Sequence, residues 1–309
     1  MKRHEMWRAD YRANRYMADA DNADLEQRSR DIQINMMKVD PLGRLIPADV
    51  LATPWWEMWT QVLEEGALRG WGPFSPRLMA RDPLPVLGYD DVPLGTRILG
   101  ERSLPTAPYL ARIGQRQHII EAFTKGRFRI APASYYSDPS LNLAIRDDEL
   151  SLAMTHSSRG ATARGIDPET GIEGEEIPLI GEIKMHRTLS DNFYVLCFSH
   201  SYDCRLLDDF SGDAIIFITD PVQFAKRLAN AVGKIRPDLD CVFRDVRYYD
   251  PYFVTKRPGD IAFLKHFRYA YQNEARFVWA RPSLGRVLEP IVVEIGSLRD
   301  IAKLRAFPV

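Results

Sequence analysis

Polar residues interrupt an otherwise strand-like segment near the C-terminus, residues 271–279. A strand has a side-chain period of two, so Gln272, Glu274 and Arg276 are expected on one face, while the apolar residues pack on the other. A carboxylate two residues after an amide on one strand face suits the holding of a ribose while its glycosidic bond breaks. That reaction passes through an oxocarbenium-like sugar, whose positive charge a carboxylate stabilises. Glu274 is therefore our first candidate catalytic residue.

The same polar strand residues also suit roles outside catalysis. Glu274 and Arg276 could belong to a solvated strand face or to a structural ion pair. A second segment, Glu182-Ile183-Lys184, matches the acid-x-Lys strand of metal-dependent nucleases, with Asp167 as an upstream acid. The sequence therefore offers a magnesium-dependent nuclease as an alternative to sugar chemistry.

The composition limits the classes of protein to consider. The chain has 309 residues, 45% of them hydrophobic, which is enough for a real core. Its formal net charge of −1 gives no global attraction for nucleic acid or an anionic membrane. Acids and arginines follow the N-terminal Met where a signal peptide would be apolar, and no apolar run approaches the roughly 20 residues of a membrane span. We expect a soluble, cytoplasmic protein with no membrane partner.

Three cysteines are an odd number and too few for a disulfide scaffold, which favours a reducing compartment. Cys197, His200 and Cys204 lie close together in sequence, but they lack a fourth ligand and the paired Cys-x-x-Cys spacing of zinc sites. We therefore predict no metal site, and expect the cysteines to be small buried residues.

The N-terminal third is expected to be helical. Residues 1 to about 38 suit one or two amphipathic helices, and Pro54 precedes a helix from Trp55 to Glu65 that Gly66 can end. Five of the six tryptophans lie at or before Trp71, which favours core or interdomain packing, with docking of a partner protein as the alternative. Residues 72–108, rich in proline and glycine, predict a wrapped connection. We divide the chain into a Trp-rich helical extension with a Pro/Gly-rich wrap, residues 1–105, and a second domain, residues 106–309.

Strands dominate the second domain. A strand-helix-strand unit spans residues 109–131, with its helix ended by Gly126, and residues 155–176 suit a loop or a two-stranded flap. Pro221 opens a helix through about Val232. Further strands are expected at residues 180–185, 193–199, 214–219, 241–249, 271–279 and 291–295. The pattern predicts an α+β fold with an antiparallel-rich mixed sheet and peripheral helices.

A series of short landmarks spans residues 109–280: Ser137-Asp138-Pro139, Cys197-Phe198-Ser199, Lys265, and a Glu-x-Arg strand at Glu274 and Arg276. Their order, rather than any single motif, resembles the bacterial family numbered 2971 among the domains of unknown function.

A second order of motifs overlays the first: Arg112 on an early strand, Ser199-His200-Ser201 on a middle strand, and Gln272-Asn273-Glu274 on a late one. This order resembles ADP-ribosyltransferases of the Arg-Ser-Glu type. The resemblance implies their fold, and NAD as a substrate. It also implies that Arg112 binds the diphosphate or ribose with its guanidinium fork and that Gln272 positions the acceptor.

The same resemblance assigns the remaining residues of the expected NAD site. Ser199 or Ser201 would orient the carboxylate of Glu274, and Tyr135 or Tyr136 would stack on the nicotinamide ring. The full NAD-binding set that we expect is Tyr109, Arg112, Tyr135, Tyr136, Ser199, Ser201 and Arg276.

The first hypothesis is therefore an NAD-consuming ADP-ribosyltransferase, in the style of toxins and phage-defence effectors, that modifies a macromolecule such as RNA or DNA. Basic side chains alternate with aromatic ones at residues 265–269 and could bind along a phosphate backbone. A basic helix end explains these residues equally well. A non-catalytic module that binds a nucleotide or a protein, with its tryptophan-rich region on a partner, is the second hypothesis. The metal-dependent nuclease is the third.

Overall fold

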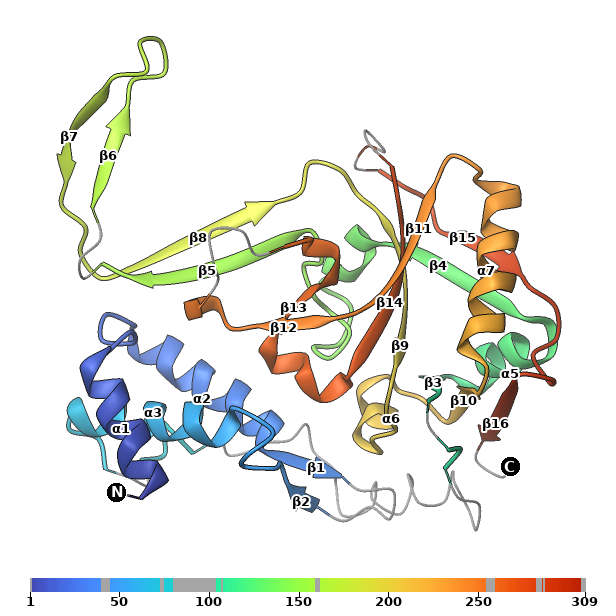
Figure 1. Ribbon diagram of the computed structural model, residues 1–309, viewed down its shortest axis with the longest axis horizontal. Coiled ribbons are helices and arrows are strands. Elements are labelled where there is room, and N and C mark those ends of the chain that lie inside the picture. Colours follow the sequence, from blue (N-terminus) through green and yellow to red (C-terminus); the bar gives the residue numbers. More distant parts are fainter. Residues whose placement is uncertain are drawn as a thin grey trace.

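A computed structural model of the chain describes residues 2–39, 45–72, 75–79, 104–106, 108–158, 162–253, 259–281, 285 and 287–306. The fold is mixed α+β with a mostly antiparallel sheet, as the sequence predicted. An N-terminal group of helices lies beside a central sheet, and a long pair of strands runs from the sheet over these helices (Figure 1). Most of the predicted wrap lies outside the described residues.

The N-terminal group contains the helices α1 (Arg3–Ala13), α2 (Asn22–Met36) and α3 (Trp55–Leu68), and the short strands β1 (Met37–Val39) and β2 (Leu45–Pro47). Asp21 caps α2 by accepting a hydrogen bond from the amide of Asp24. The prediction that Gly66 ends α3 is wrong, because the helix continues to Leu68. A Cβ at Gly66 would lie 2.5 Å from Leu78, so this glycine permits close packing instead.

Aromatic side chains hold this group together and join it to the sheet. The partly or fully buried tryptophans Trp55, Trp56, Trp59 and Trp71 belong to one apolar cluster with side chains of α1, α2 and α3. Phe267, which stacks on Trp55, carries that cluster across to the C-terminal half of the chain. These tryptophans therefore serve internal packing, which is the first of the two roles expected for them.

An eight-stranded sheet forms the centre of the molecule, in the order β11-β14-β9-β3-β10-β16, with β4 beside β9 and β15 beside β4. The described pairs within it are antiparallel. Its strands are β3 (Leu110–Gly114), β4 (Arg127–Pro132), β9 (Tyr194–Ser199), β10 (Ala214–Ile218), β11 (Asp240–Asp245), β14 (Glu274–Ala280), β15 (Ile291–Glu294) and β16 (Ala302–Ala306).

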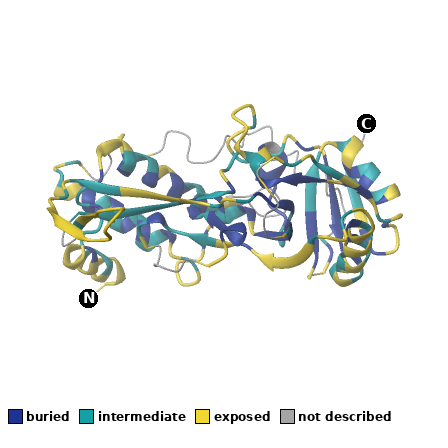
Figure 2. Cartoon of the chain, turned by 90° about the horizontal axis from the view of Figure 1, so that it is seen from above, coloured by how far each residue is buried: buried dark blue, intermediate teal, exposed yellow. Residues whose placement is uncertain are grey.

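Helices cover the two faces of this sheet. On one face, α5 (Arg116–Lys125) and α7 (Pro221–Ile235) pack their apolar side chains against the main core, which includes Phe198 and Phe277. The other face packs against α6 (Arg205–Asp209) and two 3₁₀ turns, η1 (Ala133–Ser137) and η3 (Ile261–Phe263). Two further 3₁₀ turns, η2 (Pro251–Phe253) and η4 (Phe267–Gln272), pack on the N-terminal aromatic cluster. Burial on both faces explains the apolar runs of the central strands, which are dark in Figure 2.

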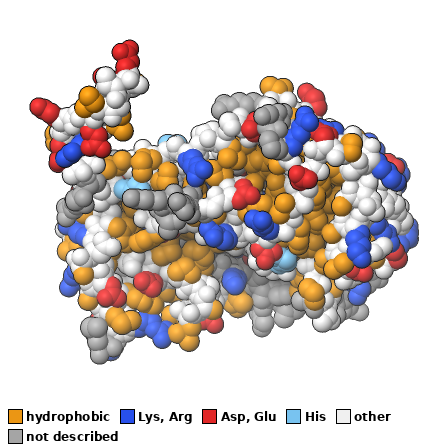
Figure 3. Space-filling view, turned by 45° about the horizontal axis from the view of Figure 1, so that its top comes forward, with side chains coloured by type: hydrophobic (Ala, Val, Ile, Leu, Met, Phe, Trp, Pro, Cys, Tyr) orange, Lys and Arg blue, Asp and Glu red, His pale blue; other side chains and the backbone are white. Residues whose placement is uncertain are grey.

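Two successive two-stranded ribbons span the segment predicted as a loop or a two-stranded flap. The strands β5 (Ser151–Ser157) and β8 (Glu182–Thr188) form the first ribbon. Lys184 of this ribbon forms an ion pair with Asp24 of α2, and Glu182 accepts a hydrogen bond from Tyr252 of η2. Beyond the first ribbon, β6 (Ala163–Ile166) and β7 (Glu173–Ile177) form a second ribbon that stands clear of the body and carries acidic side chains (Figure 3). The flap alternative is thus confirmed.

Two predicted strands differ from those of the structure. The segment 241–249 divides into β11 and β12 (Arg247–Tyr249), which pairs in parallel with β13 (Leu264–His266). Between them, the amide of Val246 donates to the carbonyl of Glu274. The segment 271–279 becomes a strand only from Glu274, because Asn273 takes a left-handed conformation (φ 45°) after η4. Gln272 therefore does not share the strand face predicted for it.

Candidate functional site

Three neighbouring strands bring the sequence motifs together. Glu274 on β14 lies opposite Ser199 on β9, and Ser199 lies opposite Ala111 on β3, next to Arg112. On that same side of β9, β4 pairs only with Val195 and Tyr194 at the other end. A middle stretch of β9 thus lacks a strand partner among the described residues on this side. The gap between β3 and β4 leaves the sheet open on the side of β9 that faces away from β14.

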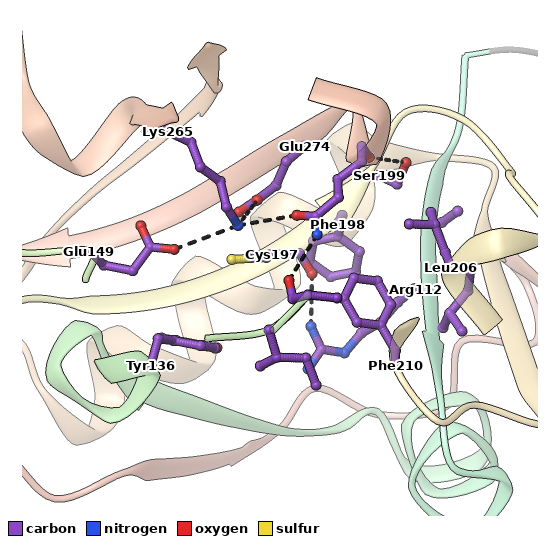
Figure 4. A pocket seen from close by; sticks show the side chains of 15 residues that line it. Arg112, Tyr136, Glu149, Cys197, Phe198, Ser199, Leu206, Phe210, Lys265 and Glu274 are labelled. Carbon is purple, nitrogen blue, oxygen red and sulfur yellow. Dashed lines mark hydrogen bonds and ion pairs between the residues drawn. The ribbon is translucent and has the colours of Figure 1, made fainter. Parts of the chain in front are cut away.

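A cavity of about 230 Å³ lies at this opening. Its walls include Arg112, Tyr136, Ser199, Gln272 and Glu274, which are five of the residues that the sequence singled out. Figure 4 shows these walls with the apolar side chains of Phe198, Leu206 and Phe210. The structure therefore brings together side chains that are up to 162 positions apart in the chain.

A buried ion cluster supplies the charge of the cavity wall. The Glu274 carboxylate lies 2.9 Å from the Lys265 ammonium and 2.6 Å from Nε of Arg276. Arg276 also reaches Glu149 at 2.6 Å, and Lys265 lies 3.7 Å from Glu149. Two cations and two carboxylates thus compensate each other, as burial requires. Lys265, Glu149 and Glu274 face the cavity, whereas Arg276, fully buried, lies behind them.

The cluster fixes the ionisation of its members. Burial alone would raise the pKa of Glu274, but Arg276 and Lys265 together hold that pKa well below its usual range. Burial acts against the charge of Lys265 too, yet Glu274 and Glu149 raise its pKa well above the ordinary value. Burial also raises the pKa of the Cys197 thiol, and the nearby Glu274 adds to that shift. Glu274 and Lys265 are therefore charged at neutral pH, and Cys197 is a thiol.

Asp147 is the carboxyl group that the cluster does not neutralise. Burial, followed by repulsion from Glu149, raises the pKa of Asp147 from 3.8 to about 7. Between these two values the folded protein binds a proton that the unfolded chain releases. The contribution of Asp147 to stability is therefore full below about pH 4 and decreases as the pH rises to about 7.

We predict that Asp147→Asn removes the decrease in stability that the ionisation of Asp147 causes between about pH 4 and pH 7. The free energy of unfolding of the variant, relative to that of the wild type, should increase from pH 4 to pH 8 when measured by urea titration. A difference between the two proteins that is constant over this range, or that decreases, would contradict the proposed ionisation of Asp147.

Arg112 has a structural contact and faces the cavity. Its Nη1 donates to the carbonyl oxygen of Cys197 at 2.8 Å, in the stretch of β9 that no described strand pairs on this side. The guanidinium carbon lies 5.7 Å from the centre of the Phe198 ring. Since an arginine has five N–H donors, others remain for a ligand in the cavity.

The two predicted serines have separate surroundings. The Ser199 hydroxyl lies 2.7 Å from the carbonyl oxygens of Ser201 and Gln272, to either of which it can donate. It orients the backbone before β14, and no hydrogen bond between it and Glu274 is present in the described structure. Ser201 lines a different cavity, beside Tyr271, where its hydroxyl accepts from Asn273. The prediction that a serine directly orients the carboxylate is therefore wrong for both.

Of the three predicted tyrosines, only Tyr136 reaches the cavity. Tyr135 is exposed on the outside, where Arg129 lies over its ring at 4.6 Å, and it meets Tyr136 edge to face. Tyr109 is buried against Phe217 in a separate apolar cluster. Neither Tyr109 nor Tyr135 lies among the cavity walls. Of these three tyrosines, Tyr136 alone is therefore placed to contact the aromatic ring of a ligand in the cavity.

The sequence patterns gave no place in the site to Glu149, Cys197 or Lys265. Cys197 was expected to be a small buried residue, and Lys265 entered through a resemblance and as part of a basic, aromatic segment. Glu149 belongs to the acidic run 147–149 before β5, a pattern that looks like a solvated turn in sequence. The structure buries it beside Arg276 instead. The position of Lys265 nine residues before Glu274 gave no signal, because a 3₁₀ turn folds the intervening segment back.

The nuclease and nucleic-acid hypotheses find little support in the described part of the chain. Asp167 accepts amides of its own turn, and Glu182 bonds to Tyr252, so the proposed metal acids have structural roles. No group of three His, Cys, Asp or Glu residues that could hold a metal occurs among the described residues. Lys265 is buried rather than exposed along a basic surface, and burial lowers the pKa of His266 to about 3, which leaves it neutral.

None of the described helices has the length and apolar character needed to cross a membrane. Comparisons of the chain with protein-family models, with curated proteins and with solved structures found no match. The resemblances to the family numbered 2971 and to ADP-ribosyltransferases therefore stay predictions, and the cavity has to be interpreted from its own geometry.

Proposed function

We propose that the cavity binds the nicotinamide-ribose end of NAD and that the protein transfers ADP-ribose from NAD to a macromolecular acceptor. The observation that supports this proposal most is that Arg112, Ser199 and Glu274, which stand on three adjacent strands, line one cavity. Glu274 stays ionised there, and the apolar walls suit a flat ring.

The reaction requires a stabilised cation at the sugar. The bond between ribose C1′ and the nicotinamide nitrogen breaks, and its electron pair leaves with the nitrogen. The oxygen or nitrogen of the acceptor then bonds to C1′ and loses a proton. Glu274 would stabilise the positive sugar and accept a hydrogen bond from a ribose hydroxyl. A carboxylate has about four lone-pair sites. Lys265 and Arg276 occupy only some of them, which leaves acceptor capacity for the sugar.

The size of the cavity limits what it holds. At about 230 Å³ it is smaller than the roughly 300–1,000 Å³ typical of pockets for drug-sized ligands. In the proposed complex the cavity would therefore take only one end of NAD, and the diphosphate would leave past Arg112. The free N–H groups of that guanidinium, with no further hydrogen bond to a described residue, suit a phosphate oxygen.

The direct test is incubation of the 309-residue chain with NAD carrying a label on the adenylate, alone and with cell extract. Nicotinamide release, and label in a protein or nucleic-acid fraction, are expected. Separate protease and nuclease treatments identify the acceptor class. The absence of both nicotinamide release and label transfer, over a range of NAD concentrations and extracts, would overturn the proposal.

Arg112→Met tests the part played by the guanidinium. We expect the KM for NAD to rise about tenfold with a smaller change in kcat, because a phosphate contact made before and during reaction contributes to both states. Steady-state nicotinamide release measures both constants. A fall in kcat at unchanged KM would instead indicate that Arg112 acts through the fold of β9 or in the transition state.

A further inference from the structure

A segment without regular structure, residues 139–147, forms part of the wall of the cavity. We call it the strap. It connects η1 to the first ribbon, and its residues Ala144 and Ile145 form part of the cavity wall. On its other side Asn142, Leu143 and Ala144 line a second cavity of about 350 Å³, so that Ala144 separates the two spaces.

Side chains from elsewhere in the protein donate hydrogen bonds to backbone carbonyls of the strap. Gln272 Nε2 donates to the carbonyl of Ala144 at 2.9 Å. The hydroxyl of Tyr269 lies 2.8 Å from the carbonyl of Arg146, to which it donates. Both residues belong to η4, directly before the strand that carries Glu274. One short element thus holds the strap and leads into the candidate catalytic strand.

A further bond runs outward from the strap, from Asn142 Nδ2 to the carbonyl of Asp209 at 2.6 Å. Beyond such hydrogen bonds, the middle of the strap contributes little apolar burial, and its side chain Leu143 is 61% exposed. Segments with few buried apolar contacts open locally at low free energy, so the strap is a candidate for opening without unfolding of the sheet.

Gln272 also connects the strap to the ion cluster. Its Oε1 accepts from the Lys265 ammonium at 3.1 Å, and the same ammonium lies 2.9 Å from Glu274. The amide therefore bridges the carbonyl of Ala144 and the ammonium of Lys265, which is the partner of the candidate catalytic carboxylate. A move of the strap away from Gln272 would free this amide beside the cavity.

The geometry points to the strap as a gate over the cavity, with Gln272 as its latch and Tyr269 as a second attachment. Opening would join the two cavities that Ala144 separates into one cleft. That cleft would admit an extended dinucleotide which the closed cavity cannot hold. The identity of this substrate rests on the proposed function, whereas the gate itself rests only on the contacts of the strap. Gln272 is thus a positioning residue rather than one that handles the acceptor.

Cys197 provides a reporter of opening that needs no substrate. Its thiol lines the same cavity as Ala144 and Ile145 of the strap, and Cys204 and Cys241 can be replaced by serine so that it is the sole thiol. In this background of the 309-residue chain we would measure the rate at which a small aromatic disulfide reagent labels Cys197. Gln272→Ala and Tyr269→Phe are each expected to increase that rate about five- to tenfold, because each removes at least one hydrogen bond that holds the strap closed.

Gln33→Ala is the matched control. Gln33 is also a buried glutamine whose Nε2 donates to the backbone carbonyl of a remote residue, Leu78, but it lies in the helical group away from the cavity. Its removal should leave the labelling rate of Cys197 within about twofold of that of the parent. If this control increases labelling as much as Gln272→Ala does, exposure follows general destabilisation and the gate is overturned.

If Gln272→Ala does not fold, Tyr269→Phe still tests the gate. This variant removes one hydroxyl and retains the aromatic ring that the Lys265 ammonium contacts. Unchanged labelling in a folded Tyr269→Phe and a folded Gln272→Ala would likewise overturn the gate. Addition of NAD to the parent separates the two proposals. Slower labelling with NAD supports ligand entry, whereas no effect of NAD alongside faster labelling in the variants supports the gate and counts against the proposed substrate.

Discussion

Replacement of Glu274 by glutamine is expected to lower the rate of nicotinamide release from NAD by at least about a hundredfold. The variant keeps the shape of the side chain but loses the negative charge that would stabilise the developing cation at the ribose, and loss of one such electrostatic contact typically costs a factor of about 10²–10³. The effect should fall on kcat, because the charge develops only in the transition state. Nicotinamide release under saturating NAD is the measurement.

Glu64→Gln is the matched control for this prediction. Glu64 is another buried glutamate held by arginines, with Arg8 at 2.8 Å, but it lies in the N-terminal helices. Its variant should release nicotinamide at the wild-type rate when folded. A folded Glu274→Gln protein with wild-type kcat would contradict a catalytic part for Glu274 and leave the carboxylate as a structural ion.

Replacement of Arg276 by methionine is expected to lower the free energy of unfolding by about 3–5 kcal/mol. Arg276 is fully buried and bonds to both Glu149 and Glu274, so the variant leaves two buried carboxylates with a single cation, Lys265. The cost is that of uncompensated charge more than of lost contacts. Urea unfolding followed by circular dichroism measures it.

Two further variants test the role of charge balance. Arg227→Met removes an ion pair with Asp300 at the surface, where water screens the charges, so its effect should be much smaller. A double variant, Arg276→Met with Glu149→Gln, restores equal numbers of buried charges. It should be less unstable than the sum of the two single variants. Additive losses would show that charge balance does not determine the stability of the cluster.

Much of the secondary structure could be predicted from local patterns. The helix from Trp55 and the strand-helix-strand unit whose helix ends at Gly126 follow from side-chain period and from capping, which act over a few residues. The predictions were wrong where distant contacts prevailed over such signals. Gly66 looked like a helix end, but its lack of a side chain serves packing against Leu78. Asn273 takes the left-handed turn that ends η4 and delays the strand to Glu274.

The sequence by itself determined that the chain forms a mixed α+β fold, and that Glu274 lies on a strand with a polar face. It determined this because side-chain period and turn residues are local properties. Only the tertiary structure decided which side chains share a cavity. Strand order places Arg112 and Ser199 beside Glu274, and folding buries Glu149 and Lys265 against it. Compensation of buried charge depends on distances between residues far apart in the chain, and those distances exist only once the sheet has formed.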